Sequence, residues 1–223
     1  MFHDPTRAVH KAITWTDPAD FAGSVREWYE RDRWTNQNLR AELWSEKDGL
    51  LGVLQDVADR WQITLRSLHG QASSTACWEI ARTFYRYGED MPIYVFHEGD
   101  FDPSGESIPA ACLTHVRLIL ETKFHCERDI RFELIGFRST DFDECNIESV
   151  EPKSKDLLLK AFYEKYGEDV RFAEVDALDK SILIGRVDDR LQELVDMNLW
   201  NASGEIETAE KAQIVSVLST LAA

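Results

Sequence analysis

The 223-residue sequence predicts an α/β protein in which helices flank a mainly parallel sheet. Short apolar and β-branched runs alternate with longer stretches in which apolar residues recur at helical spacing. Strands separated by helices of such length form β-α-β units, whose strands lie parallel with right-handed crossovers. The run PIYVFH at 92–97 is nearly all apolar, as expected of a strand covered on both faces.

Each element follows from its own pattern. Phe21, Val25 and Trp28 recur at helical spacing and indicate a short helix near the start, and the apolar spacing from Leu50 to Trp61 indicates an amphipathic helix. The predicted strands are 39–44, 63–68, 92–97, 130–137 and 171–175. The other helices are predicted over about 75–87, 103–123 and 155–166, with one or two more from about 179 onward.

Three segments follow from this rhythm: an N-terminal helical appendage at 1–38, a main domain at 39–200, and a C-terminal helix at 201–223. The run DFDECNIESVE at 141–151 holds five acidic residues and no basic one, and we interpret it as a solvated loop.

The chain has 41 acidic and 25 basic residues, a formal charge of −16, which excludes a broad basic surface for nucleic acid. A local site that recruits metal cations remains open. The four cysteines are scattered and are expected to be reduced thiols. With no apolar run of about 20 residues and no signal-peptide pattern, the expected location is the cytoplasm.

Carboxylates follow three predicted strands at the point where each ends. Glu46 follows the first strand, Asp100 and Asp102 follow the third, and Asp176 follows the last. In a parallel sheet these ends share one edge, where ligands of open α/β sheets bind. Clustered carboxylates repel one another, and a divalent cation such as Mg²⁺ or Mn²⁺ relieves the repulsion. For Asp176, hydrogen bonding at the strand end is an equally good interpretation.

Phosphate-binding candidates lie beside these acids. Pro103 fixes the turn after Asp102, and Ser104 and Gly105 open a helix whose N-terminal amides favour an anion. After the second strand, Gly70 and Ser73 could cradle a phosphate, or form a tight turn and a helix cap.

The motifs WSEKDGL at 44–50, HGQASS at 69–74 and VFHEGDFDPSGESI at 95–108 resemble the TOPRIM domain of topoisomerases, primases and certain nucleases. The likeness is to the branch related to the topoisomerase VI A subunit, with phage and bacterial relatives, and it covers about 39–200. It implies a TOPRIM/Rossmann-like sheet whose metal is held by Glu46, Asp100 and Asp102, with Glu46 doubling as general base. About forty residues precede the first strand, too few for the tyrosine-bearing winged helix of that branch, so strand passage is not expected.

The expected function is therefore divalent-metal-dependent phosphodiester chemistry on nucleic acid, most simply a DNA nuclease. Lys47 would steer phosphate or pair with Glu46 or Asp48, and Arg31 and Arg33 would supply a local basic patch. One alternative is a non-catalytic module that binds metal, nucleic acid or a partner subunit within a topoisomerase-VI-like assembly. Another is a phosphatase of the haloacid dehalogenase type, ranked last because that type places D-x-D after its first strand.

Overall fold

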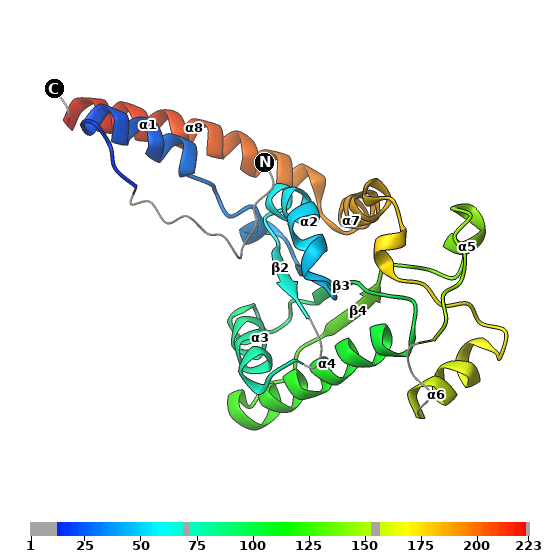
Figure 1. Ribbon diagram of the computed structural model, residues 1–223. Helices are drawn as coiled ribbons and strands as arrows, with labels where there is room; N and C mark the ends of the chain where they lie inside the picture. Colours follow the sequence, from blue (N-terminus) through cyan, green and yellow to red (C-terminus); the bar gives the residue numbers. More distant parts are fainter. Residues whose placement is uncertain (1–12, 69–71, 153–156, 222–223) are drawn as a thin grey trace. The chain divides into compact units, whose positions relative to one another are not determined.

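The computed structural model describes residues 13–68, 72–152 and 157–221 (Figure 1). The chain divides into two compact units. One is formed by residues 38–194, and the other by the two flanking segments, up to residue 37 and from residue 195 onward.

A four-stranded, all-parallel sheet forms the centre of the 38–194 unit, which confirms the predicted fold class. Its strands are β1 (Arg40–Ser45), β2 (Thr64–Ser67), β3 (Ile93–Glu98) and β4 (Ile130–Leu134), in the order β2-β1-β3-β4. The central strands pair from Arg40 with Ile93 to Ser45 with Glu98, so they end together.

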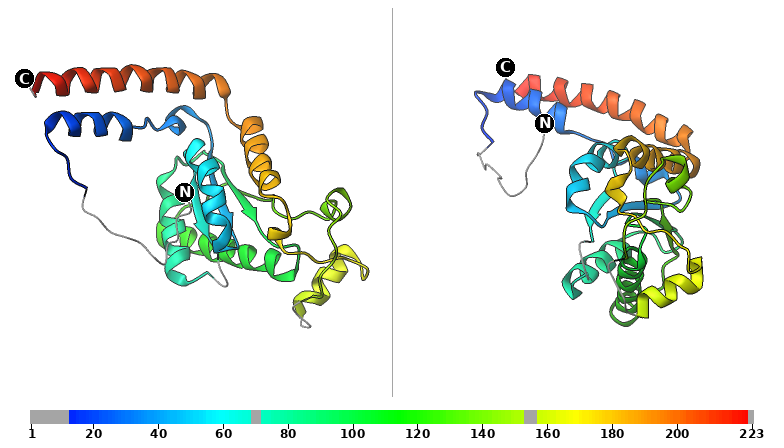
Figure 2. Two further views of the ribbon diagram at one scale, coloured as in Figure 1. Left: turned by 45° about the horizontal axis from the view of Figure 1, so that its top comes forward. Right: turned by 45° about the vertical axis from the view of Figure 1, so that its right-hand side comes forward.

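Helices cover both faces of this sheet (Figures 1 and 2). α3 (Ser74–Arg86) and α4 (Pro103–Phe124) pack on the face that presents Trp44, Ile93 and Val95. α2 (Asp48–Arg60) and α7 (Lys180–Leu194) pack together on the opposite side. Apolar residues of α2 at helical spacing, such as Leu50, Leu54 and Val57, are buried as their periodicity predicts. The remaining elements of the unit are α5 (Asp141–Glu144), α6 (Leu157–Tyr166) and the 3₁₀ turn η3 (Val175–Ala177).

The predicted strand at 171–175 is wrong. The segment is extended but makes only one antiparallel bridge, in which Ala173 exchanges backbone hydrogen bonds with Phe101 beyond the end of β3. Phe172 of this segment is buried against aromatic rings, with its ring stacked on that of Phe162 at 5.6 Å between centroids. β4 is also shorter than predicted, because the backbone amides of residues 135 and 136 both turn to the carbonyl oxygen of His97.

The interpretation of 141–151 as a solvated loop is wrong at its start. Asp141 is fully buried, begins α5, and accepts a hydrogen bond from the backbone N–H of Arg138 at 2.7 Å. The guanidinium of Arg186 on α7 also pairs with this carboxylate, with Nη1 3.0 Å from Oδ2. A run of acidic residues can thus hide one buried ion pair, since composition does not show which member turns inward.

The second unit contains α1 (Pro18–Trp28), the 3₁₀ turn η2 (Arg33–Asn36) and α8 (Met197–Leu221). α1 and α8 pack side by side (Figure 2), and Trp34 packs edge-on against Trp200 with 5.5 Å between ring centroids. The predicted division at residues 200/201 falls inside α8, and the compact unit that contains the sheet ends at residue 194. Among the described residues, none of the helices combines the length and the apolar character needed to cross a membrane.

Candidate functional site

The loops after β1 and β3 meet at the carboxyl edge of the sheet. The backbone N–H of Glu46 donates to the carbonyl oxygen of Glu98 at 3.0 Å, which extends the pairing of the two strands by one residue. The backbone N–H of Asp100 then donates to Oε2 of Glu46 at 3.1 Å. The structure therefore brings Glu46 and Asp100 to one edge, as the parallel sheet predicts.

Two glycines allow this close approach. A Cβ on Gly99 would lie 2.4 Å from Nε2 of His97 and 3.3 Å from Oε2 of Glu46. A Cβ on Gly105 would lie 2.2 Å from the carbonyl oxygen of Asp100. The glycines of the motif EGDFDPSG therefore let the loop and the first turn of α4 fold against each other without collision.

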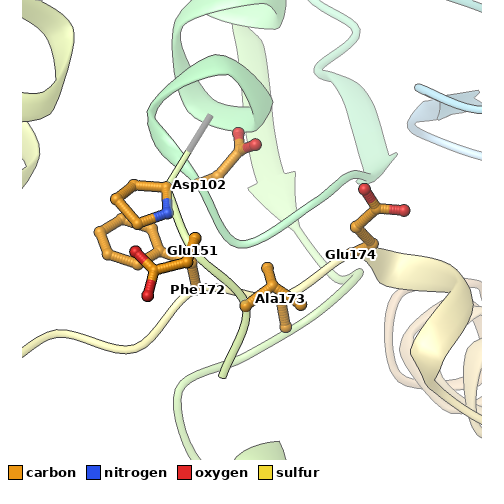
Figure 3. Close-up of a pocket in the computed structure, with 7 residues that line it drawn as sticks. Asp102, Glu151, Phe172, Ala173 and Glu174 are labelled. Carbon is orange, nitrogen blue, oxygen red and sulfur yellow. The ribbon is translucent and has the colours of Figure 1, made fainter. Parts of the chain in front are cut away.

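Asp102 caps the N-terminus of α4. Its Oδ1 accepts the backbone N–H of Gly105 at 2.7 Å, and Pro103 occupies the first helical position. Asp100 and Asp102 are each only 6% exposed. Figure 3 shows the Asp102 carboxylate beside the start of α4, apart from the carboxylate of Glu174. Asp102 is thus at the predicted edge and is engaged by its own helix.

Lys47 places its ammonium among three carboxylates. Nζ lies 2.6 Å from Oδ1 of Asp176, 2.8 Å from Oε2 of Glu174 and 3.5 Å from Oδ1 of Asp100. Burial alone would lower the pKa of Lys47, but the hydrogen bonds to Asp176 and Glu174 outweigh this and raise it. Of the two expected roles of Lys47, pairing with Glu46 or Asp48 is wrong, because its ammonium pairs with Asp100, Glu174 and Asp176 instead.

This arrangement fixes the 173–176 segment at the sheet edge. The backbone N–H of Val175 donates to Oδ1 of Asp100 at 2.8 Å, next to the contact of Lys47 with the same carboxylate. Asp176, expected after a last strand, instead lies in the 3₁₀ turn η3. Asp100 and Asp176 are therefore gathered around Lys47.

The oxygen chemistry of these side chains fits a hard divalent cation. Within the described ranges, however, no group of three or more His, Cys, Asp and Glu side chains has the geometry to hold a metal ion. The acidic side chains are arranged instead around the Lys47 ammonium and around backbone N–H groups. Any metal held by Glu46, Asp100 and Asp102 requires some of these contacts to exchange.

The phosphate-binding candidates have other roles where they are described. Gly70 lies outside the described residues. Ser73 caps α3, where its Oγ accepts the N–H of Ala76 at 3.1 Å. The N–H of Gly105 is taken by Asp102. Ser104 is half-buried in the first turn of α4. Its backbone N–H is one of those at the N-terminal end of the helix that have no acceptor within the helix.

Arg31 and Arg33 do not form the expected basic patch. Nη1 of Arg31 lies 2.6 Å from Oε1 of Glu210, and Nη2 of Arg33 lies 3.2 Å from Oε2 of Glu207. The hydroxyl of Tyr29 donates to Oε2 of the same Glu210 at 2.6 Å. Carboxylates of α8 therefore compensate both guanidinium charges within this unit.

Two buried titratable residues, His97 and Glu98, end β3. Glu98 is fully buried on the side of α7, and neither carboxylate oxygen has a hydrogen-bond partner within the described residues. Burial raises the pKa of Glu98 to about 8, although Arg186 and Arg138 oppose the shift. His97, also fully buried, faces Phe132 at 5.8 Å, and burial lowers its pKa to about 4. The sequence signal for both was polar residues closing an otherwise apolar strand.

No protein-family model matches this chain, and a search of curated proteins found no match either. The expected likeness to TOPRIM domains therefore depends on the three sequence motifs alone.

Proposed function

We propose that this protein binds Mg²⁺ or Mn²⁺ at the carboxyl edge of its sheet and performs phosphodiester chemistry on nucleic acid as a nuclease of the TOPRIM type. The supporting observation is the hydrogen bond between the Asp100 backbone and the Glu46 carboxylate, 54 positions apart. It lies where the strand order β2-β1-β3-β4 reverses direction, the place at which open α/β sheets bind ligands.

Each residue at the carboxyl edge of the sheet has a distinct role in this proposal. Glu46, Asp100 and Asp102 would supply oxygen ligands, and a bound divalent ion would polarise the scissile phosphate and activate a water molecule. Glu46 is half-buried at the end of β1, where its carboxylate can accept a proton from that water. The first turn of α4 would offer a phosphate its remaining backbone N–H groups, since the N–H of Gly105 already donates to Asp102.

Lys47 compensates charge in this proposal. Its ammonium stabilises the carboxylates of Asp100, Glu174 and Asp176 when no divalent cation is present. A divalent cation at Asp100 competes with this ammonium, so cation binding and the position of Lys47 are linked. The proposal places the protein in the cytoplasm, where its four unpaired cysteines stay reduced.

A nicking assay tests the enzyme. Purified protein should convert supercoiled plasmid to the open-circular form with Mn²⁺ or Mg²⁺, and EDTA should stop the reaction. Glu46→Gln preserves the shape of the side chain but removes its charge, so nicking should fall by at least about a hundredfold. A nicking rate that Glu46→Gln leaves unchanged would show a contaminating nuclease.

A thermal-shift titration tests the metal separately. A cation at about 100 times its dissociation constant stabilises the folded state by about 2.7 kcal/mol. The double variant Asp100→Asn, Asp102→Asn should lose that stabilisation. An equal shift in both proteins would place the cation elsewhere, for example on the exposed acids of 143–151.

A non-catalytic binding module is the second candidate. The observation that favours it is Lys47, which already compensates the charge at the edge without a metal ion. Binding of DNA or RNA without cleavage, with both metals and at several pH values, would support this module over the nuclease.

A further inference from the structure

Three aromatic rings form a stack on the outer side of α3 and α4. The rings of Tyr85 and Phe124 are stacked, with 4.6 Å between centroids and 21° between planes. The Trp78 ring packs on Phe124 in a tilted arrangement, with 5.3 Å between centroids and 33° between planes. Trp78 and Tyr85 remain 39% and 46% exposed. The buried side of α3 makes the contacts that hold α3 on the protein. The exposed rings are therefore not needed for packing, and exposed apolar surface of this kind is typical of a binding site.

Three arginines, Arg82, Arg86 and Arg128, lie near these rings. The guanidinium of Arg128 lies 6.0 Å from the centroid of the Tyr85 ring and donates to the backbone oxygens of Phe84 and Tyr85 at 3.2 and 3.0 Å. These carbonyl acceptors are neutral, so they position the cation without cancelling its charge. Arg82 and Arg86 are exposed on α3, on the side that carries Trp78 and Tyr85.

The local charge balance is opposite to that of the chain. Segments 74–87 and 117–128 together hold five basic and three acidic residues, whereas the whole chain has 25 basic and 41 acidic ones. Arg82 pairs with Glu79, but both side chains are nearly half-exposed, and such a solvent-exposed pair contributes little stability. The guanidinium can therefore exchange this carboxylate for a phosphate.

We propose that the α3–α4 aromatic face, formed by Trp78, Tyr85, Phe124, Arg82, Arg86 and Arg128, binds a short single-stranded nucleic-acid segment through base stacking. Aromatic rings for the bases and cations for the backbone are the combination that single-strand binding uses. Protein interfaces also favour Trp, Tyr and Arg, so it is the surplus of cations over carboxylates in these segments that favours a phosphate-bearing ligand over a protein.

The dimensions agree with such a ligand. Trp78 and Arg86 are eight residues apart on α3, about 12 Å along the helix axis. At about 3.4 Å per stacked nucleotide, this length accommodates about three nucleotides. α4 starts at the candidate metal edge and ends at Phe124, about 33 Å away. The α3–α4 aromatic face is thus separate from the acidic edge, and its binding needs no metal.

The choice of ligand rests on the proposed function, but the test does not. A fluorescein-labelled 12-nucleotide oligothymidine is titrated with the protein in EDTA, and fluorescence anisotropy gives the dissociation constant. Trp78→Ala and Tyr85→Ala should each weaken binding at least about fivefold. Trp78→Phe keeps a ring and should stay within about twofold of the wild type. Trp28→Ala removes a 54% exposed ring of α1 and should change nothing.

Salt dependence tests the arginines. Arg82→Ala with Arg86→Ala should make the slope of log K against log salt concentration shallower by about 1.4, because two phosphate contacts are lost. The melting temperature of each variant verifies its fold, and Trp78→Phe keeps the test informative if Trp78→Ala unfolds.

Three results would overturn the proposal. The first two are no binding of oligothymidine or oligouridine by the wild type, and equal affinity of wild type and Trp78→Ala. A variant that changes the oligomeric state in size-exclusion chromatography, but not oligonucleotide affinity, would assign the face to a protein partner and also overturn it. If plasmid nicking fails while Trp78→Ala still weakens binding in EDTA, the cleavage proposal falls and this one stands.

Discussion

The backbone N–H of Asp100 donates a 3.1 Å hydrogen bond to the Glu46 carboxylate and so joins the end of β3 to the end of β1. The bond couples the position of one acidic residue to the backbone of another. The backbone of Asp100 also packs directly against Gly105 of α4. The distance between the loop after β3 and the start of α4 therefore depends on a glycine at position 105.

Gly105→Ala should destabilise the protein. The new Cβ would stand 2.2 Å from the carbonyl oxygen of Asp100, and this backbone cannot yield without moving the edge. We expect the free energy of unfolding to fall by at least about 1–3 kcal/mol in urea titrations. The matched control is Gly52→Ala in α2, where nothing lies within 4 Å of the new Cβ and a gain of up to about 1 kcal/mol is expected. Equal stability of the two variants would contradict the observed packing.

Lys47→Met should lower the melting temperature in EDTA. The variant leaves the carboxylates of Asp100, Glu174 and Asp176 without their shared ammonium, and Asp100 is almost fully buried. The rise in melting temperature on adding Mg²⁺ or Mn²⁺ should then exceed that of the wild type. Lys160→Met, which removes a 76% exposed side chain, is the control and should change neither value. Unchanged melting of Lys47→Met would show that the ion pairs contribute nothing.

Arg186→Met should strongly lower the free energy of unfolding. It leaves the fully buried carboxylate of Asp141 without its cation, and breaking a buried pair from one side costs about 3–5 kcal/mol. Arg131→Met removes an exposed partner of Asp129 and should cost no more than about 1 kcal/mol. Urea unfolding compares the two, and adding Asp141→Leu to Arg186→Met should recover part of the loss.

His97 should make the protein less stable in acid. Its pKa is about 4 in the folded state, against an ordinary value of 6.5, so the unfolded chain takes up the proton first as the pH falls. The cost begins near pH 6.5, reaches about 2 kcal/mol at pH 5 and levels off below pH 4. His97→Leu should remove this part of the difference in unfolding free energy between pH 7.5 and pH 5. An identical difference in the variant would assign the acid sensitivity to other groups.

Periodicity predicted the sheet and its helices because burial on these elements follows the strand and helix repeats. The meeting of Glu46 and Asp100 was predictable for a simpler reason: parallel strands end at one edge whatever their order. The segment at 171–175 misled because a short, mostly apolar run shows only that the segment is covered, and not that it pairs with a strand. Here aromatic side chains, not a neighbouring strand, provide the cover.

The partners of the charged site residues were not predictable. Glu174 and Asp176 reach Lys47 across 127 and 129 positions of the chain, and Glu207 and Glu210 reach Arg33 and Arg31 across 174 and 179. Nothing in the local sequence marks such pairs. In an acidic chain, basic residues that are clustered in the sequence can be neutralised by carboxylates that are distant in the sequence. Only the contacts in the structure distinguish a ligand site from such an internal ion pair.

The pairing of β1 with β3 has a consequence for how the chain folds during synthesis. Arg40 is paired with Ile93, so the central strand β1 must wait for residues made 53 positions later. At about 5–20 residues per second this takes about 3–10 s, during which one side of an apolar strand is open to other chains. β2 can cover only the opposite side. Aggregation of unfinished chains, rather than instability of the finished protein, is therefore the expected failure when many copies are made at once.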